Sequence, residues 1–214
     1  MMDAIFSDMI DEAIVIIYMD DIFLFAPDEA TLTENTKRVL VQLQENDLFL
    51  KPKKCEFNKP KVEYLGMIIE EGQISMDPGK LSGIRDWPAP TTVKQVRGFL
   101  GFGNFYRRFV QNFSELAKPL NEHLKKEWKF EWTDECQQAF DTMKQKFTEE
   151  PVLGMLDHNK PFQIDCDTSK YTSGAVLTQL DANGDRHPCA FISKTFSPTE
   201  RNYEIYNRKL LAII

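Results

Sequence analysis

The stretch IVIIYMDDIFLF, residues 14–25, constrains this 214-residue chain more than any other. Two short apolar runs flank a pair of adjacent aspartates, Asp20 and Asp21. Apolar runs of this length around a short polar turn predict a β-hairpin. Turns of this kind usually carry Asn, Gly or Ser, whereas two neighbouring carboxylates repel each other and are costly to desolvate without a cation nearby. The pattern therefore indicates either a magnesium-binding hairpin or an acidic hairpin tip in solvent.

Composition excludes several classes of protein. The chain is 42% hydrophobic, which is ordinary for a globular fold, and it has no apolar run long enough to cross a bilayer. Its first residues lack the basic start and cleavage site of a secretory signal, so we expect an intracellular protein with no membrane partner. The four cysteines lie far apart without a C-x-x-C pair, which argues against a zinc site or a disulfide framework.

Charge is distributed unevenly along the chain. Residues 1–50 hold two basic and eleven acidic side chains, a net charge of −9. Residues 51–126 have a net charge of +6 and residues 127–214 a net charge of −4. An acidic segment with paired aspartates followed by a basic segment is typical of a metal site next to a surface that follows phosphates. An ordinary solvated surface remains the alternative for the basic segment.

Hydrophobic periodicity and turn residues predict a mixed α+β chain. Helices are predicted over residues 28–46, 78–87, 92–110, 113–125 and 133–147, with a last helix that begins at Ser197 or Thr199. Strands are predicted over residues 54–57, 62–69, 73–76, 161–166, 173–179 and 188–194. The aromatic residues of the 92–110 helix favour a core stripe over a base-stacking platform: Phe99, Phe102, Phe105, Tyr106 and Phe109.

Five strings, in this order, resemble the Pol polyprotein of gypsy-type LTR retrotransposons. They are YMDDIFLFA, LKPKKCEFNKPKVEYLGMII, IRDWPAPTTVKQVRGFLGFGNFYRRFV, FEWTDECQQAFDTMK and FQIDCDTSKYTSGAVLTQ, the last followed by RNYEIYNRKLLAII. The resemblance implies a reverse transcriptase palm remnant over 1–76, a helical thumb over 77–126, a connecting helix over 127–150 and a truncated RNase H-like domain over 151–214. The fold expected from it is the C-terminal part of a palm, a thumb, and the N-terminal half of an RNase H-like α/β domain.

Catalytic roles follow from the same resemblance. Asp20 and Asp21 match the family's YxDD box, whose aspartates bind Mg²⁺ for nucleotidyl transfer together with an earlier aspartate. That aspartate, the fingers and the nucleotide pocket have no counterpart in this sequence, so we expect dNTP use only with a partner chain that supplies them.

Nucleic-acid contacts are implied at two further places. The string Tyr64-Leu65-Gly66-Met67 resembles the primer grip, although a strand with a tight turn explains it equally well. The thumb helix would follow an RNA–DNA hybrid or primer–template duplex, with phosphate contacts from Lys94, Arg97, Arg107 and Arg108. Three glycines in this helix, Gly98, Gly101 and Gly103, imply a close approach to a backbone or a neighbouring helix.

The RNase H-like part departs from its family pattern. Asp167 matches the metal-binding aspartate of the first strand. Lys209 stands where the family's helix carries a glutamate, and an ammonium there would repel the metal ions. We therefore expect a fragment of an RNA-directed DNA polymerase that is catalytically incomplete by itself. The alternatives are a duplex-binding module without chemistry and a decayed element without a selected role.

Overall fold

The computed structural model describes residues 2–122, 124, 130–149, 152–181 and 183–213. The chain forms two compact units, Met1–Tyr64 and Leu65–Ile214, and both combine helices with strands, which confirms the predicted α+β class. The predicted division into four parts stays a prediction, and its boundaries near 126 and 150 lie outside the described residues. Among the described residues, no helix is both long enough and apolar enough to cross a membrane.

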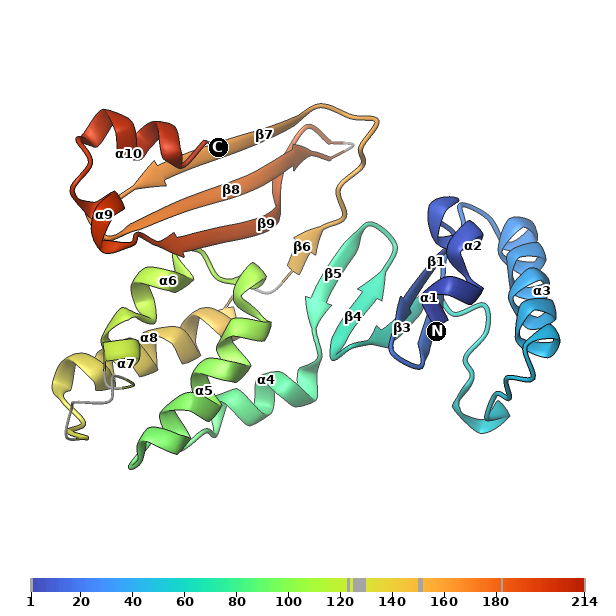
Figure 1. The fold of residues 1–214 in the computed structure, drawn as a ribbon, viewed down its shortest axis with the longest axis horizontal. Coiled ribbons are helices and arrows are strands. Elements are labelled where there is room, and N and C mark those ends of the chain that lie inside the picture. Colours follow the sequence, from blue (N-terminus) through green and yellow to red (C-terminus); the bar gives the residue numbers. More distant parts are fainter. Residues whose placement is uncertain (1, 123, 125–129, 150–151, 182, 214) are drawn as a thin grey trace. The chain divides into compact units, whose positions relative to one another are not determined.

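The first unit packs a hairpin against helices. Its elements are α1 (Met2–Ile5), α2 (Ser7–Asp11), β1 (Val15–Tyr18), β2 (Asp21–Leu24), α3 (Glu29–Glu45), η1 (Pro52–Lys54) and β3 (Lys61–Tyr64) (Figure 1). Strands β1 and β2 pair antiparallel. Helix α3 begins after Asp28, whose side chain accepts the backbone N–H of Thr31 and so caps the helix. The buried core of this unit consists of Phe6, Met9, Val15, Val39 and Leu43.

The second unit begins with a small sheet and a group of helices. These elements are β4 (Met67–Glu70), β5 (Gln73–Met76), α4 (Pro78–Arg85), α5 (Val93–Phe105), η2 (Arg107–Phe109), α6 (Phe113–Leu116), α7 (Lys118–Glu122), α8 (Asp134–Glu149) and β6 (Val152–Gly154). Strand β5 pairs antiparallel with β4 on one side and with β6 on the other. Thr92 caps the start of helix α5, because its hydroxyl accepts the N–H of Gln95. Apolar residues of α4, α5, α6 and α8 form one core with β5 and β6.

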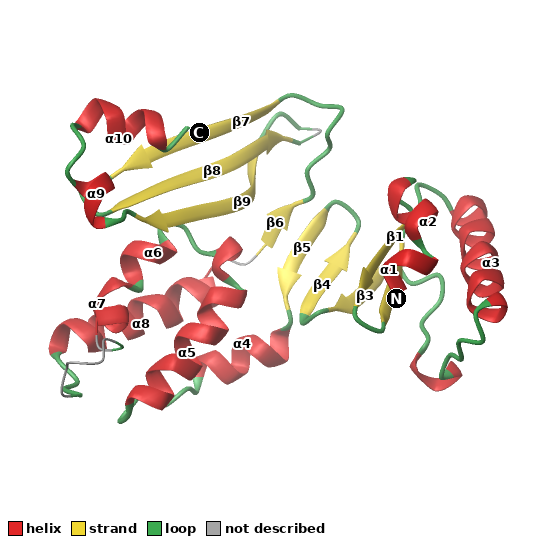
Figure 2. Cartoon of the chain, in the orientation of Figure 1, coloured by secondary structure: helices red, strands yellow, loops and turns green. Residues whose placement is uncertain are grey.

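The second unit ends with a larger sheet. Its elements are β7 (Phe162–Thr168), β8 (Thr172–Leu180), β9 (Arg186–Thr195), α9 (Pro198–Arg201) and α10 (Ile205–Leu211). The sheet is antiparallel in the order β7-β8-β9, with an irregularity between Leu177 and Thr178 (Figure 2). Helix α6 and η2 contact β9, and α10 contacts β7. Ser197, one of the two residues at which the sequence predicts the last helix to begin, forms a capping box with Glu200 at the start of α9.

Aromatic side chains dominate the helical core. The rings of Phe99 and Phe140 lie 4.5 Å apart, and Trp87 packs edge-on against Phe99. Phe99, Tyr106 and Phe109 are buried, which confirms most of the predicted core stripe. The prediction is wrong for Phe105, whose side chain is 53% exposed.

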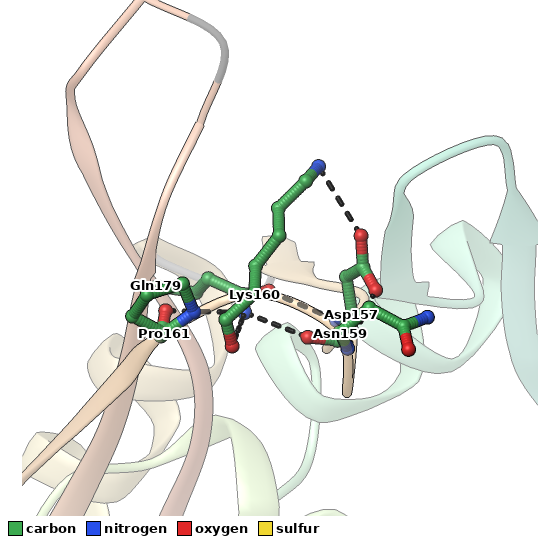
Figure 3. Close-up of polar contacts among 5 residues, drawn as sticks. All are labelled: Asp157, Asn159, Lys160, Pro161 and Gln179. Carbon is green, nitrogen blue, oxygen red and sulfur yellow. Dashed lines mark hydrogen bonds and ion pairs between the residues drawn. The ribbon is translucent and has the colours of Figure 1, made fainter.

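A buried glutamine fixes the loop that leads into β7. Gln179 on β8 receives the backbone N–H of Asp157 on its side-chain oxygen at 2.9 Å. Its amide nitrogen donates to the carbonyl oxygens of Asp157, Lys160 and Pro161 at 2.9–3.3 Å (Figure 3). The loop therefore uses one side chain as the partner for four backbone groups.

Several predicted elements are wrong in detail. The predicted strand at 54–57 is absent, and the chain instead forms the 3₁₀ turn η1 just before it. The predicted strand at 62–69 is broken after Tyr64. The predicted helix at 92–110 ends at Phe105 and continues as η2, and the 113–125 helix is two short helices, with residue 125 outside the described residues. Helices α1 and α2 and strand β6 were not predicted.

Candidate functional site

The aspartate pair lies at the tip of the β1–β2 hairpin. Tyr18 pairs with Asp21, so Met19 and Asp20 form a two-residue turn. Met19 has a φ of +55°, and Asp20 is not among the described residues with positive φ. A positive φ in a two-residue hairpin turn usually requires glycine, asparagine or aspartate. A bulky residue in the left-handed region stores strain of about 1–2 kcal/mol, and such strain occurs preferentially at functional sites.

Both carboxylates face solvent. Asp20 and Asp21 are exposed, so neither is buried against an apolar surface. Carboxylate oxygens are ligands that Mg²⁺ prefers, and proteins often hold Mg²⁺ with only one or two carboxylates while phosphates and waters complete its shell. The pair fits such an ion. No group of three or more His, Cys, Asp or Glu side chains able to hold a metal ion occurs among the described residues.

Tyr64, the first residue of the predicted primer grip, lies beside this hairpin in the same unit. Its ring stacks on Phe23 of β2 with 4.9 Å between the ring centroids. Burial raises the pKa of the Tyr64 phenol, and the negative charges of Asp21 and Tyr18 raise it further. The phenol oxygen is buried and has no hydrogen-bond partner in the part of the chain that the structure describes. The structure thus brings together two predicted site segments, Asp20-Asp21 and Tyr64.

The turn that follows Tyr64, formed by Leu65 and Gly66, belongs to the second unit and is closely packed. Leu65 and Gly66 have φ angles of +51° and +72°, the pattern of a type I′ turn. The carbonyl oxygen of Gly66 accepts the Tyr106 hydroxyl at 3.0 Å. A Cβ atom on Gly66 would lie 2.5 Å from that hydroxyl oxygen. The glycine is therefore required by Tyr106 of this chain, whereas the primer contact predicted for Tyr64, Leu65, Gly66 and Met67 stays a prediction.

One face of helix α5 is basic and open. Lys94 and Arg97 of the helix, and Arg108 of the η2 turn that follows it, are all exposed. No acidic residue occurs in α5. A Cβ atom on Gly98 or Gly101 would meet no atom of the described residues within 4 Å, so the middle of this face presents bare backbone.

The third glycine of α5 has a different role. A Cβ on Gly103 would lie 3.1 Å from the Phe113 ring and 3.3 Å from the end of Met143. Gly103 thus permits close helix packing, as the sequence predicts for glycines in this helix, whereas Gly98 and Gly101 have no such neighbour within the described residues.

Arg107 is engaged in the interior of the second unit. Its guanidinium donates hydrogen bonds to the Ser193 carbonyl oxygen of β9 and, at 3.3 Å, to the Ser114 hydroxyl of α6. The Ser114 N–H donates to the Ser193 hydroxyl at 2.9 Å in the same junction. These bonds compete with the phosphate contact predicted for Arg107, and that contact stays a prediction.

Asp167 lies on an exposed part of β7 opposite Gly174 of β8. One of its carboxylate oxygens accepts the N–H of Thr168 at 2.8 Å. On α10, which contacts β7, Arg208 donates to the Ser169 carbonyl oxygen at 3.1 Å, while Lys209 is exposed. Asp167 is therefore available to solvent, but the neighbouring helix offers cations instead of a second carboxylate at these two positions.

A group of cations around Tyr171, a residue of the β7–β8 turn, was not predicted from the sequence. Lys118, Lys170 and Arg201 all lie within 6 Å of its ring centroid. Only Lys170 is adjacent to Tyr171 in sequence, and the other two come from α7 and α9. Lys170-Tyr171 was the one local signal, and it is too short to interpret alone.

Two family models match the chain. Residues 1–69 match the model described as reverse transcriptase (RNA-dependent DNA polymerase), and residues 132–214 match an RNase H-like domain found in reverse transcriptase.

Curated relatives are Pol polyproteins of transposons. The chain is 36% identical to the retrovirus-related Pol polyprotein from transposon 297 of Drosophila melanogaster, covering 93% of the chain and 18% of the relative. The corresponding polyprotein from transposon 412 is also 36% identical, over 100% of the chain and 17% of its own length. The transposon Tf2-3 polyprotein of Schizosaccharomyces pombe is 32% identical, over 95% of the chain and 15% of its own length. The chain thus spans less than a fifth of each of these three relatives.

Solved structures share the fold. A foamy viral protease-reverse transcriptase in complex with an RNA/DNA hybrid matches with a TM-score of 0.80 and 22% identity, over 99% of this chain and 28% of that one. The same type of protein in complex with dsDNA matches with a TM-score of 0.76 and 23% identity, over 98% of this chain and 45% of that one. At this identity the likeness shows the fold alone.

Proposed function

This chain carries reverse transcriptase and RNase H-like segments of the retrotransposon Pol type, and from that premise we propose that it grips a nucleic-acid duplex during RNA-directed DNA synthesis. The duplex is an RNA–DNA hybrid or a primer–template. The observation that carries the proposal is the exposed surface of α5 and η2, where Lys94, Arg97 and Arg108 are exposed and Gly98 and Gly101 present bare backbone. Such a face places cations near phosphates and lets the helix approach the duplex closely.

The aspartates supply part of the chemistry. Asp20 and Asp21 would hold Mg²⁺ at the hairpin tip, where the ion would supply positive charge to phosphate oxygens. Both carboxylates are exposed at the two-residue turn, and the Tyr64 ring stacks on Phe23 of β2. Nucleotide addition requires a further carboxylate and a dNTP pocket from another segment or chain of the parent assembly. Because this synthesis takes place inside the cell, we place the chain there.

Binding tests the duplex grip. Affinity of the full chain for a labelled RNA–DNA hybrid is measured across a salt series for the wild type and for K94Q/R97Q/R108Q. Each lost phosphate contact lowers the slope of log affinity against log salt by roughly 0.9, so we expect a decrease of about 2–3. The charge-matched control is K37Q/K146Q/K160Q, since each of these lysines has a carboxylate partner. Equal slopes for both triple variants would contradict the proposal.

A second candidate is a duplex-binding module without chemistry. The exposed ammonium of Lys209 on α10 favours it, as does the lack of a group of three or more possible metal ligands in the described part of the chain. Asp20→Ala separates the two candidates in an assembly complemented with the remaining palm. Loss of nucleotide incorporation with unchanged hybrid binding supports a catalytic role for Asp20, and unchanged incorporation supports the binding module.

A further inference from the structure

Three cations converge on one aromatic ring at the β7–β8 turn. The Lys118 ammonium lies 3.8 Å from the centroid of the Tyr171 ring. The Arg201 guanidinium carbon lies at 5.5 Å and the Lys170 ammonium at 5.8 Å. These two longer distances place any two of the three charges within about 11 Å of each other, which is close to the Debye length of about 10 Å at 0.1 M salt. The three charges therefore act as one positive patch, which we call the Tyr171 patch.

The backbone around the patch is held in place. The N–H of Phe196 donates to the Tyr171 carbonyl oxygen at 2.8 Å, and the N–H of Tyr171 donates to the Ser169 hydroxyl at 3.2 Å. Arg208 donates to the Ser169 carbonyl oxygen, which fixes the turn from the side of α10. A patch on a fixed turn loses little conformational entropy when it binds a ligand.

The positive charge of the patch is not neutralised within the described part of the chain. Lys118, Lys170 and Arg201 form no ion pair there, whereas the nearby Glu200 carboxylate pairs with Lys194 and accepts the N–H of Ser197. A ring attracts one exposed cation by about 0.5–1 kcal/mol, and the cations repel one another. A bound anion removes this repulsion, so the arrangement suits an anionic ligand.

The geometry of the patch favours contacts with phosphates over stacking with nucleobases. Tyr171 is 37% exposed, and an ammonium at 3.8 Å already occupies one face of its ring. A nucleobase therefore cannot stack on that face. The exposed ammonium of Lys170 and the partly exposed Lys118 remain free to contact oxygens of a phosphodiester backbone.

We propose that the Tyr171 patch is a second nucleic-acid contact, one that binds the phosphodiester backbone of the duplex held by α5. The inference rests on the proposed function. The turn follows directly after β7, so the contact would hold the duplex at the strand that carries Asp167. The contact would combine Lys118 of α7 with Lys170 of the β7–β8 turn.

The test compares two double variants of the full chain. In K118Q/K170Q both ammonium groups of the patch are lost, while Arg201 is kept because its side chain also donates to the Phe196 carbonyl oxygen. In the control K146Q/K160Q, two lysines of the same unit with carboxylate partners are neutralised. The salt slope for a labelled RNA–DNA hybrid should fall by about 2 in the first variant and remain near the wild-type value in the second. K118R/K170R keeps both charges and should retain the wild-type slope.

The possible outcomes separate this inference from the proposed function. If K118Q/K170Q has the same slope as K146Q/K160Q while K94Q/R97Q/R108Q lowers it, the patch is a structural contact and only this inference fails. If the wild type shows no salt-dependent binding, both proposals fail. If K118Q/K170Q unfolds, a K118R/K170R variant with a reduced slope overturns the inference, since the charge is then not what binds.

Discussion

Gly66 and Gly72 have the same left-handed backbone but different surroundings. Their φ angles are +72° and +74°. A Cβ on Gly72 would meet no atom within 4 Å in the part of the chain that the structure describes, whereas one on Gly66 would lie 2.5 Å from the Tyr106 hydroxyl oxygen. Tyr106 is 3% exposed and packs against Phe102 and Phe105, so its ring has little room to move. Substitutions at Gly66 and Gly72 therefore separate the energetic cost of backbone strain from that of a steric clash.

We expect Gly66→Ala to destabilise the protein more than Gly72→Ala. The left-handed conformation costs each alanine about 1 kcal/mol. Gly66→Ala also displaces the Tyr106 hydroxyl from the Gly66 carbonyl oxygen, which adds about 1 kcal/mol or more. The measurement is the free energy of unfolding in urea. Equal losses in the two variants would show that Tyr106 adjusts at no cost, and that Gly66 is needed only for its backbone conformation.

At the level of single residues, the sequence draws attention to Asp20 and Asp21 but does not reveal contacts between residues that lie far apart in the chain. The exposed pair Asp20 and Asp21 could be identified because two adjacent carboxylates between apolar strands repel each other unless a cation lies nearby. The involvement of Arg107 with Ser193 could not be predicted, because these residues are 86 positions apart and neither shows a pattern that implies the other. The contact between Lys118 and Tyr171 could not be predicted for the same reason.

Helix α5 shows how one element divides its glycines between two roles. In an exposed helix interior, alanine is more favourable than glycine by about 1 kcal/mol. Gly98→Ala and Gly101→Ala should each raise the free energy of unfolding by up to about 1 kcal/mol, because their positions are open. Gly103→Ala should give no such gain, since the Phe113 ring lies 3.1 Å from the added carbon.

The same variants test binding against stability. If α5 approaches a duplex through its bare backbone, the double variant G98A/G101A should bind an RNA–DNA hybrid more weakly by about 1 kcal/mol, about fivefold, although the fold is more stable. Urea unfolding and hybrid titration on the same samples give both quantities. A variant that is more stable and binds as tightly as the wild type would show that the face between Lys94 and Arg108 does not approach the duplex closely.

At the level of elements, prediction succeeded where the sequence carried its own boundary signal. Asp28, Thr92 and Ser197 each cap a helix where the sequence predicts one. Short strands lack such boundary signals. The β-prone residues at 54–57 form no strand because Pro52 starts a 3₁₀ turn beside them, and β6 has only three residues and depends on its pairing with β5. A three-residue strand has no periodicity that could identify it.

At the level of the whole molecule, charge follows the proposed division of roles. The segment 1–50, with a net charge of −9, carries the two aspartates, and the segment 51–126, with a net charge of +6, carries α5 and Lys118. An acidic hairpin attracts cations, and a basic middle segment attracts a polyanion, so the two functions are placed on different parts of the sequence.

Acid should destabilise both units, because each contains carboxylates whose folded state favours the charged form. The pKa of Glu12 is lowered by its hydrogen bonds from Arg38, and the pKa of Asp28 by those from Thr31. In the second unit, backbone N–H groups of Asn159, Asp185 and Ser197 lower the pKa values of Asp157, Asp181 and Glu200. A carboxyl group whose folded pKa lies below its unfolded value stabilises the fold above the unfolded pKa, and this contribution is lost as the pH falls through the folded value.

The melting temperature should therefore remain level from neutral pH to about pH 5 and fall below about pH 4, near the ordinary pKa of Asp and Glu. Glu200→Gln tests the assignment, because the amide keeps the size of the side chain but removes the titrating group from the capping box of α9. Its melting temperature should be lower than that of the wild type at pH 7, and the difference should shrink towards pH 3. Glu34→Gln serves as the control, since Glu34 is exposed and its ion pair with Lys37 is long, at 3.8 Å. A difference between Glu200→Gln and wild type that grows in acid would mean that the Glu200 carboxylate does not stabilise the start of α9.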